Sequence, residues 1–223
     1  MLKVGIIDSG LPPAYSYCVE EVKDFTGNQA IIDQLGHGTA VTHIIGHNLP
    51  ASIIAARVFH DKLVCTPSQI AEAIHWLISM KVNMINMSFG LRNDRSILRE
   101  ACEKALRKNI ILVAAAPSQG DPVYPSNYNE IIRATGDARC KPNEISWLNS
   151  PQADFAGYSG KPHLGPAGAS IGCASVTAAI AQIKMKYPHY NQAEIIKALK
   201  QRVNHQGTQR DSSRIAVGQR HDK

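Results

Sequence analysis

Short, almost continuously apolar segments alternate along this chain with longer segments of helical periodicity. Residues 110–116 contain no polar side chain, which is typical of a strand buried on both faces of a parallel sheet. Strands are expected at 3–7, 52–59, 82–88, 110–116 and 131–136, and helices at 68–80 and 96–108. This alternation predicts an α/β domain with a central, mostly parallel sheet flanked by helices.

The rest of the chain contains weaker signals. They predict a turn or an edge strand at 18–23, short antiparallel strands around Ile145 and Asp154-Phe155, and helices at 170–187 and 191–203. A length of 223 residues fits one domain with an ample core. We therefore expect one domain over residues 1–205, followed by a basic C-terminal tail over residues 206–223.

Residues 166–183 combine a tight turn with a run of small side chains. Glycine and proline come first, Ser170 follows, and small or apolar residues fill most of the remainder. This order predicts a turn that opens directly into a buried helix lying close against the sheet. Ser170 would stand at the helix N-terminus, where free N–H groups and the helix dipole favour an oxyanion. Taken alone, Ser170 is more simply an N-cap.

Two further side chains stand at a strand end and at a helix start. Asp8 follows the first expected strand, at the edge where parallel sheets place their chemistry, although an isolated Asp-Ser-Gly is also a common turn. His37 lies between two glycines and could act as a general base and then as a general acid, or be a structural histidine. His43 and His47 have no carboxylate to complete a zinc site, so we interpret them as ordinary helix and loop residues.

Composition and charge exclude several classes of protein. The net charge of +6 mildly favours acidic partners, but there is no Lys/Arg block with interleaved aromatic residues to indicate nucleic-acid binding. There is neither a membrane-spanning apolar run nor a signal-peptide pattern, so we expect a cytoplasmic protein away from the membrane. The five cysteines are scattered, which predicts reduced thiols. We expect no metal and no cofactor.

Asp8, His37 and Ser170 follow one of the chain orders by which unrelated folds assemble a Ser-His-Asp triad. At these residues the chain resembles the subtilisin-like serine proteases. The stretches that carry the resemblance are Val4-Gly5-Ile6-Ile7-Asp8-Ser9-Gly10, Gly36-His37-Gly38-Thr39-Ala40, Ile85-Asn86-Met87-Ser88-Phe89-Gly90 and Gly168-Ala169-Ser170. The resemblance covers roughly residues 3–199 and implies a three-layer subtilisin-like fold.

The resemblance also implies a mechanism. Ser170 would attack a peptide carbonyl, His37 would take the serine proton and later return it, and Asp8 would orient the imidazole. An acyl-enzyme would form and then be hydrolysed. An extended peptide would pair with the site as an added strand. Its walls would be Ser88, Phe89 and Gly90 on one side, and Ala115, Ala116, Val123 and Tyr124 on the other.

The chain departs from the family pattern at the oxyanion hole. Where the family usually has Gly-Asn after an Ala-Ala-Ala strand, this chain has Pro117-Ser118, so the asparagine donor is missing. The Ser118 hydroxyl or the Gln119 amide could replace it, beside the backbone N–H of Ser170. Loss of such a donor in a family member costs about 100- to 1,000-fold in kcat. We expect a slow enzyme, or one whose oxyanion hole is completed on substrate or partner binding.

Two expected absences shape the functional hypothesis. The first strand begins at about Lys3, so we expect no propeptide, and the segment before residue 52 lacks the asparagine-rich loop of the family's calcium site. A fast, unblocked protease would be hazardous in the cytoplasm. We therefore expect a selective serine endopeptidase that removes a leader from a modified peptide.

The chain looks like the compact cytoplasmic family members that mature modified peptides, including one that serves quinohemoprotein amine dehydrogenase assembly. Its partner would be a peptide or protein substrate, or a complex of substrate and maturation enzyme. Two alternatives stay open. A peptide-binding scaffold with weak or no turnover is favoured by the missing asparagine and opposed by the intact Asp8, His37 and Ser170. Acyl transfer to an amine would need an inserted cap that excludes water, and no insertion is large enough.

Overall fold

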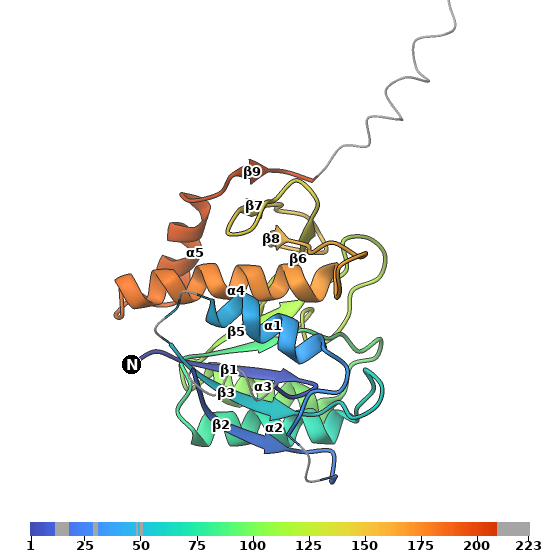
Figure 1. Ribbon diagram of the computed structural model, residues 1–223. Coiled ribbons are helices and arrows are strands. Elements are labelled where there is room, and N and C mark those ends of the chain that lie inside the picture. Colours follow the sequence, from blue (N-terminus) through green and yellow to red (C-terminus); the bar gives the residue numbers. More distant parts are fainter. Residues whose placement is uncertain (12–17, 29–30, 48, 50, 209–223) are drawn as a thin grey trace, which may run out of the picture.

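The computed structural model describes residues 1–11, 18–28, 31–47, 49 and 51–208. Within these residues nine strands form one sheet in the order β2-β3-β1-β4-β5-β6-β8-β7-β9 (Figure 1). The strands are β1 (Lys3–Asp8), β2 (Val19–Asp24), β3 (Ser52–Arg57), β4 (Met84–Met87), β5 (Ile111–Ala115), β6 (Ile132–Asp137), β7 (Ile145–Trp147), β8 (Phe155–Tyr158) and β9 (His205–Gln206). Every neighbouring pair is parallel except β7 and β8.

Helices cover both faces of the sheet, which gives three layers (Figure 1). One face carries α1 (His37–Gly46), α4 (Ala169–Lys186) and α5 (Gln192–Lys200), and the other carries α2 (Pro67–Ser79) and α3 (Ser96–Leu106). A separate apolar core lies on each face of the sheet. The central strands are therefore buried from both sides, as their continuous apolar sequence predicts.

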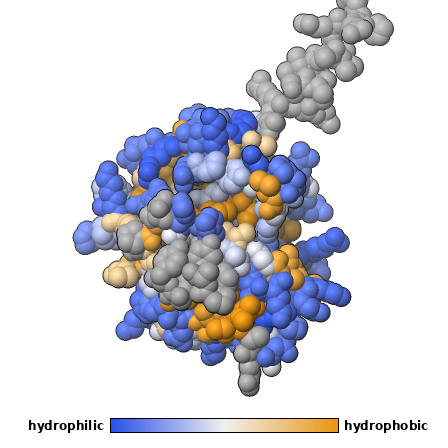
Figure 2. Space-filling view, viewed as in Figure 1, coloured by the Kyte–Doolittle hydropathy of each residue, from blue (hydrophilic) through white to orange (hydrophobic). Residues whose placement is uncertain are grey.

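Two helices, α2 and α5, begin at capping boxes that fix their first turns. Thr66 accepts a hydrogen bond from the backbone N–H of Gln69 at the start of α2, where Pro67 occupies the first helical position. Asn191 accepts from the N–H of Glu194 at the start of α5. The face of the molecule seen in Figure 2 is largely hydrophilic, in keeping with the amphipathic character of these helices.

The central helix α4 is held close to the sheet by its small residues. Ten of its residues are buried. A Cβ atom on Gly172 would overlap the backbone carbonyl of Thr135 in β6, so no larger residue fits at that position. The close approach fixes where α4 begins, and therefore where Ser170 lies.

The predicted α/β architecture is confirmed, and most of its elements lie where the sequence places them. Residues 19–24 are an edge strand rather than a turn, and β7 and β8 form the expected antiparallel pair. The parallel pairing of β8 with β6 and the short strand β9 were not predicted. The predicted boundary at residue 205 falls inside β9, and residues 209–223 of the expected tail lie outside the described residues. In the described ranges, no helix combines the length and the apolar character needed to cross a bilayer.

Candidate active site

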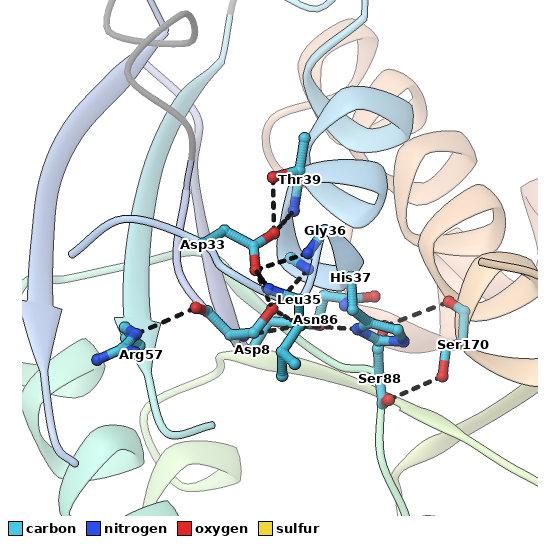
Figure 3. A network of polar contacts seen from close by, with 12 residues as sticks. Asp8, Asp33, Leu35, Gly36, His37, Thr39, Arg57, Asn86, Ser88 and Ser170 are labelled. Carbon is cyan, nitrogen blue, oxygen red and sulfur yellow. Dashed lines mark hydrogen bonds and ion pairs between the residues drawn. The ribbon is translucent and has the colours of Figure 1, made fainter. Parts of the chain in front are cut away.

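Four chain segments meet at the carboxyl edge of the sheet. Asp8 is the last residue of β1, and Ser88 directly follows the parallel neighbouring strand β4. His37 is the first residue of α1 and Ser170 lies in the first turn of α4. Figure 3 shows these side chains around one small region, although they come from distant parts of the sequence.

Asp8 and His37 form a buried contact. The His37 Nδ1 atom lies 2.7 Å from Asp8 Oδ1, and the two residues are 8% and 2% exposed. Because a carboxylate can only accept a hydrogen bond, Nδ1 carries the proton and Nε2 is left to accept one. This is the tautomer that a general base needs.

The environment of His37 sets the pH range in which it can accept a proton. Burial alone would lower the pKa of His37, but the hydrogen bond and charge of Asp8, with a contribution from the charge of Asp33, raise it above its ordinary value. A base must be unprotonated to act. Activity that depends on His37 would therefore be lost as the pH falls through this raised pKa.

The start of α1 is docked directly on the end of β1. The backbone N–H of Gly38 donates to the Ser9 hydroxyl at 2.9 Å. A Cβ atom on Gly38 would overlap the carbonyl oxygen of Gly10, so only glycine allows this approach. The glycine that follows His37 therefore brings the imidazole to Asp8.

Asp33 is a residue of this network that the sequence analysis missed. Its carboxylate lies at the centre of the network in Figure 3 and accepts hydrogen bonds from the loop and helix that carry His37. The available signal was an acidic residue four positions before a helix start, a place from which it can accept from free N–H groups of the first turn.

Ser170 is not an N-cap. The N-cap of α4 is Gly168, which makes no side-chain capping bond. The Ser170 hydroxyl instead donates to the backbone carbonyl of Ser88 at 2.9 Å, and the Ser88 hydroxyl donates to the Ser170 carbonyl at 3.2 Å. Within the described part of the chain, no hydrogen bond joins Ser170 to His37. The hydroxyl therefore rests on Ser88 and not on the imidazole.

A buried amide supports the Ser88 side of the site. Asn86, fully buried in β4, donates to the Ser88 hydroxyl at 2.8 Å and accepts from the Thr177 hydroxyl of α4 at 2.8 Å. Asn86 thus ties β4 to the helix that carries Ser170, a role that the sequence analysis did not assign to it. Cys173 is fully buried in the same region, and burial raises the pKa of its thiol to about 12, so it is protonated at neutral pH.

The two expected walls of the substrate cleft are joined to each other. Leu91, which follows Gly90, pairs with Tyr124 in an antiparallel bridge with N···O distances of 2.7 and 2.8 Å. Gly90 lies against Val123 so closely that a Cβ atom would overlap the valine side chain. Phe89 is half-buried. The cleft is therefore closed where the two walls meet.

The other expected wall residues contribute little exposed surface. Ser88 is 3% exposed, Ala115 is 6% exposed and Ala116 is 1% exposed. The Ala116 N–H already donates to the Ala134 carbonyl within the sheet. Ser88 contacts Ser170 directly, while the two alanines lie in the interior.

The oxyanion candidates Ser118 and Gln119 lie beside the turn that precedes Ser170. Both are exposed and both line a cavity of about 530 Å³ together with Gly168 and Ala169. Neither side chain is hydrogen-bonded to another group of the described chain. Both are therefore available to donate to a ligand in this cavity.

No metal cluster is present among the described residues: nowhere in them do three His, Cys, Asp or Glu side chains gather closely enough to hold an ion. The side chains gathered at the site supply hydroxyl, imidazole and carboxylate groups.

A model of the subtilase family matches residues 2–218. The chain belongs to the subtilase family. This subtilase is 27% identical to subtilisin DY of Bacillus licheniformis over 221 residues, which are 87% of the chain and 80% of that protein. It is 28% identical to the major intracellular serine protease of Bacillus subtilis over 157 residues, which are 59% of the chain and 49% of that protein. The second relative is by its name a serine protease, and membership of the subtilase family supports a serine protease, and so a hydrolase.

Solved structures show the same fold. The nisin leader peptidase NisP from Lactococcus lactis has a TM-score of 0.68 at 19% identity, over 88% of this subtilase and 81% of that chain. Sphericase has a TM-score of 0.67 at 19% identity, over 92% of this subtilase and 85% of that chain. At this identity the likeness is one of fold, and it agrees with the predicted subtilisin-like architecture.

Proposed function

We propose that the chain is a serine endopeptidase in which Asp8, His37 and Ser170 form the catalytic triad. The observation that carries the proposal is the buried contact of 2.7 Å between Asp8 and His37, at the sheet edge to which α4 also brings Ser170. Among the histidines that the structure describes, His37 is the one paired with a buried carboxylate at the end of β1. Family membership supports the same assignment.

The chemistry begins with a rotation of the serine. Ser170 turns about χ1 away from the Ser88 carbonyl and donates to His37 Nε2. Its Oγ attacks the scissile carbonyl carbon while its proton passes to Nε2, and the developing oxyanion accepts from the Ser170 N–H and from Ser118 or Gln119. His37 then protonates the leaving amine. Water hydrolyses the acyl-enzyme by the same route.

The resting hydrogen bond of Ser170 links its activation to substrate binding. A peptide that adds as a strand beside Ser88 offers a backbone N–H to the same carbonyl that now accepts from Ser170. Competition for this acceptor releases the hydroxyl when a substrate strand is in place. The reactivity of Ser170 toward a small probe is accordingly low when no peptide strand is bound.

We further propose a narrow, cytoplasmic processing role, in which the enzyme removes a leader from a modified peptide, free or held by its maturation enzyme. Support comes from the joined cleft walls, from the missing asparagine at Ser118 and from the intracellular serine proteases among the relatives. NisP is by its name a leader peptidase, so this fold serves such a role in at least one protein. The alternative is a peptide-binding scaffold with weak or no turnover, favoured by the same missing asparagine.

The activity is tested by labelling the purified protein with a fluorophosphonate probe and measuring the mass of the adduct. We expect one adduct on Ser170 in the wild type and none in Ser170→Ala, with His37→Ala reducing labelling strongly because the base is lost. No labelling alone or with a candidate substrate complex would favour the scaffold.

Breadth of cleavage tests the processing role separately. Active enzyme and Ser170→Ala are each incubated with a proteome-derived peptide mixture, and new N-termini are counted by mass spectrometry. A narrow enzyme leaves nearly all peptides intact. Casein cleavage at rates typical of the family, or cuts at many unrelated sites, would exclude the narrow role while leaving the protease assignment in place.

A further inference from the structure

Asp33 is held by more hydrogen bonds than a carboxylate needs for a turn. Its two oxygens accept from the Ser9 hydroxyl (2.8 Å), the Leu35 N–H (3.0 Å), the Gly36 N–H (3.0 Å), and the Thr39 N–H (2.8 Å) and hydroxyl (2.6 Å). Burial alone would raise the pKa of Asp33, but these hydrogen bonds, those of Thr39 first, hold it below its ordinary value. The carboxylate is therefore charged at neutral pH.

One of these donors also touches the catalytic pair. The Ser9 hydroxyl lies 2.8 Å from Asp33 Oδ1 and 3.2 Å from Asp8 Oδ1, and it accepts from the Gly38 N–H. A hydroxyl has a single proton, and the shorter contact directs it to Asp33. Asp8 Oδ1 is thereby left to the His37 ring and to the Ser9 N–H, which donates at 2.8 Å.

The remaining contacts of Asp33 hold the segment that leads into His37. Leu35 and Gly36 immediately precede the imidazole, and Thr39 lies in the first turn of the same helix. Figure 3 shows the Asp33 carboxylate between this helix start and the end of β1. Asp33 therefore fixes the position of His37 through three sets of contacts: with the loop before it, with the first turn of its helix, and with Ser9.

The other charged groups near this network are engaged elsewhere. Arg57 is fully buried, donates through Nε to the Ser9 carbonyl at 3.2 Å, and pairs with Asp24 at 2.9 Å. Its Nη2 lies 2.9 Å from His60 Nδ1. Asp8 and Asp33 are thus the acidic groups that act on His37, and Arg57 supports the Ser9 backbone.

We propose that Asp33 is a positioning residue for the triad: it holds His37 against Asp8 and keeps the Ser9 hydroxyl turned away from Asp8. In its absence, the Ser9 proton is free to turn to Asp8 Oδ1 and to compete with the imidazole for that oxygen. The kinetic consequence rests on the proposed protease function, whereas the structural consequence does not.

The first test needs no activity. In a Ser170→Ala background, the titration of His37 is followed by NMR of ¹³C-labelled histidine, with the signal assigned by its loss in His37→Asn. We expect Asp33→Asn to lower the His37 midpoint by about half a pH unit, because one nearby negative charge is removed and the hold of Asp8 is weakened. The matched control, Asp154→Asn, removes a carboxylate paired with Arg133 and is expected to leave the midpoint unchanged.

The second test measures the labelling rate of Ser170 against pH in the wild-type background. Asp33→Asn is expected to slow labelling about tenfold on the plateau and to move its acid limb to lower pH. Ser9→Ala is expected to slow it about threefold. Because the Ser9–Asp33 hydrogen bond is one link that both variants break, the double variant is expected to lose less than the product of the two single effects.

Each outcome decides between the hypotheses. An unchanged His37 midpoint in folded Asp33→Asn, or a double variant that loses the product of the two single effects, would overturn the positioning role. Should Asp33→Asn fail to fold, an unchanged labelling rate in Ser9→Ala overturns it. Absence of labelling in the wild type would refute the protease function alone, since the NMR result stands by itself.

Discussion

Ser118 occupies the place where the resemblance to subtilisins leads one to expect an asparagine. Its shorter side chain faces the cavity beside the Ser170 turn. We predict that Ser118→Asn accelerates probe labelling and peptide cleavage by about 10- to 100-fold, because it restores a side-chain donor to the oxyanion. The rates are compared with those of the wild type, Ser118→Ala and Gln119→Ala.

The alanine variants identify the donor in use. A rate that falls in only one of them assigns the donor to that side chain. If Ser118→Asn folds but is labelled and cleaves peptides no faster than the wild type, the oxyanion is stabilised by a group outside this loop. The missing asparagine would then not make the enzyme slow.

The sequence predicted that Asp8 lies at a strand end and His37 at a helix start, but it did not predict all of their contacts. Asp8 and His37 were chosen from a strand end and a glycine-flanked helix start, and the structure brings them into contact. The Ser170 contact with the Ser88 carbonyl was beyond prediction, since it depends on one side-chain rotamer. Asp33 was missed because an isolated Asp in an irregular loop carries no periodic pattern.

Among the elements, α4 leaves no room for a larger side chain at Gly172. In an exposed helix, Gly→Ala would stabilise the fold by about 1 kcal/mol. In α4, Gly172→Ala meets the Thr135 carbonyl, and we predict the opposite sign, a loss of about 1–3 kcal/mol or more. Urea unfolding measures the change, and probe labelling is expected to fall with it because Ser170 lies two residues before Gly172.

A second substitution on α4 separates the effect of helix propensity on stability from the effect of packing against the sheet. Ala178→Gly is expected to cost about 1 kcal/mol while leaving labelling intact, since residue 178 is only half-buried. If Gly172→Ala stabilised the protein, the close approach of α4 to β6 could not be present in solution.

Element prediction succeeded where apolar periodicity was long and failed where pairing was decided at a distance. The central strands and α2 were found to within a few residues because each buries a continuous apolar face. β9 contains two residues and exists because it pairs with β7. The neighbours of β8 could not be predicted from its own residues, because it pairs in parallel with β6 on one side and antiparallel with β7 on the other.

At the scale of the whole molecule, the two tryptophans report on opposite parts of the fold. Trp76 lies in α2 beside Phe25, and Trp147 lies in β7 below Lys200. Because one sheet runs through both regions, we predict that the whole domain unfolds in a single urea transition. The fluorescence of Trp76→Phe, the fluorescence of Trp147→Phe and the loss of probe labelling should each follow this one transition. Fluorescence of each single-tryptophan variant is compared with labelling at every urea concentration. Separate midpoints for the two tryptophans would show that the halves of the sheet unfold independently.

The order of the site residues along the chain means that the site is completed late during synthesis of the protein. Asp8 and His37 are made first, but the serine arrives on α4, the helix that also covers one face of the sheet. At ~5–20 residues per second, roughly ten to thirty seconds separate the synthesis of Asp8 from that of Ser170. In the proposed triad Ser170 is the nucleophile, so a nascent chain in that interval lacks the group that would cut its ribosomal neighbours, and it also lacks the helix that closes one core. Hydrolytic capacity appears only once translation of the domain is nearly complete.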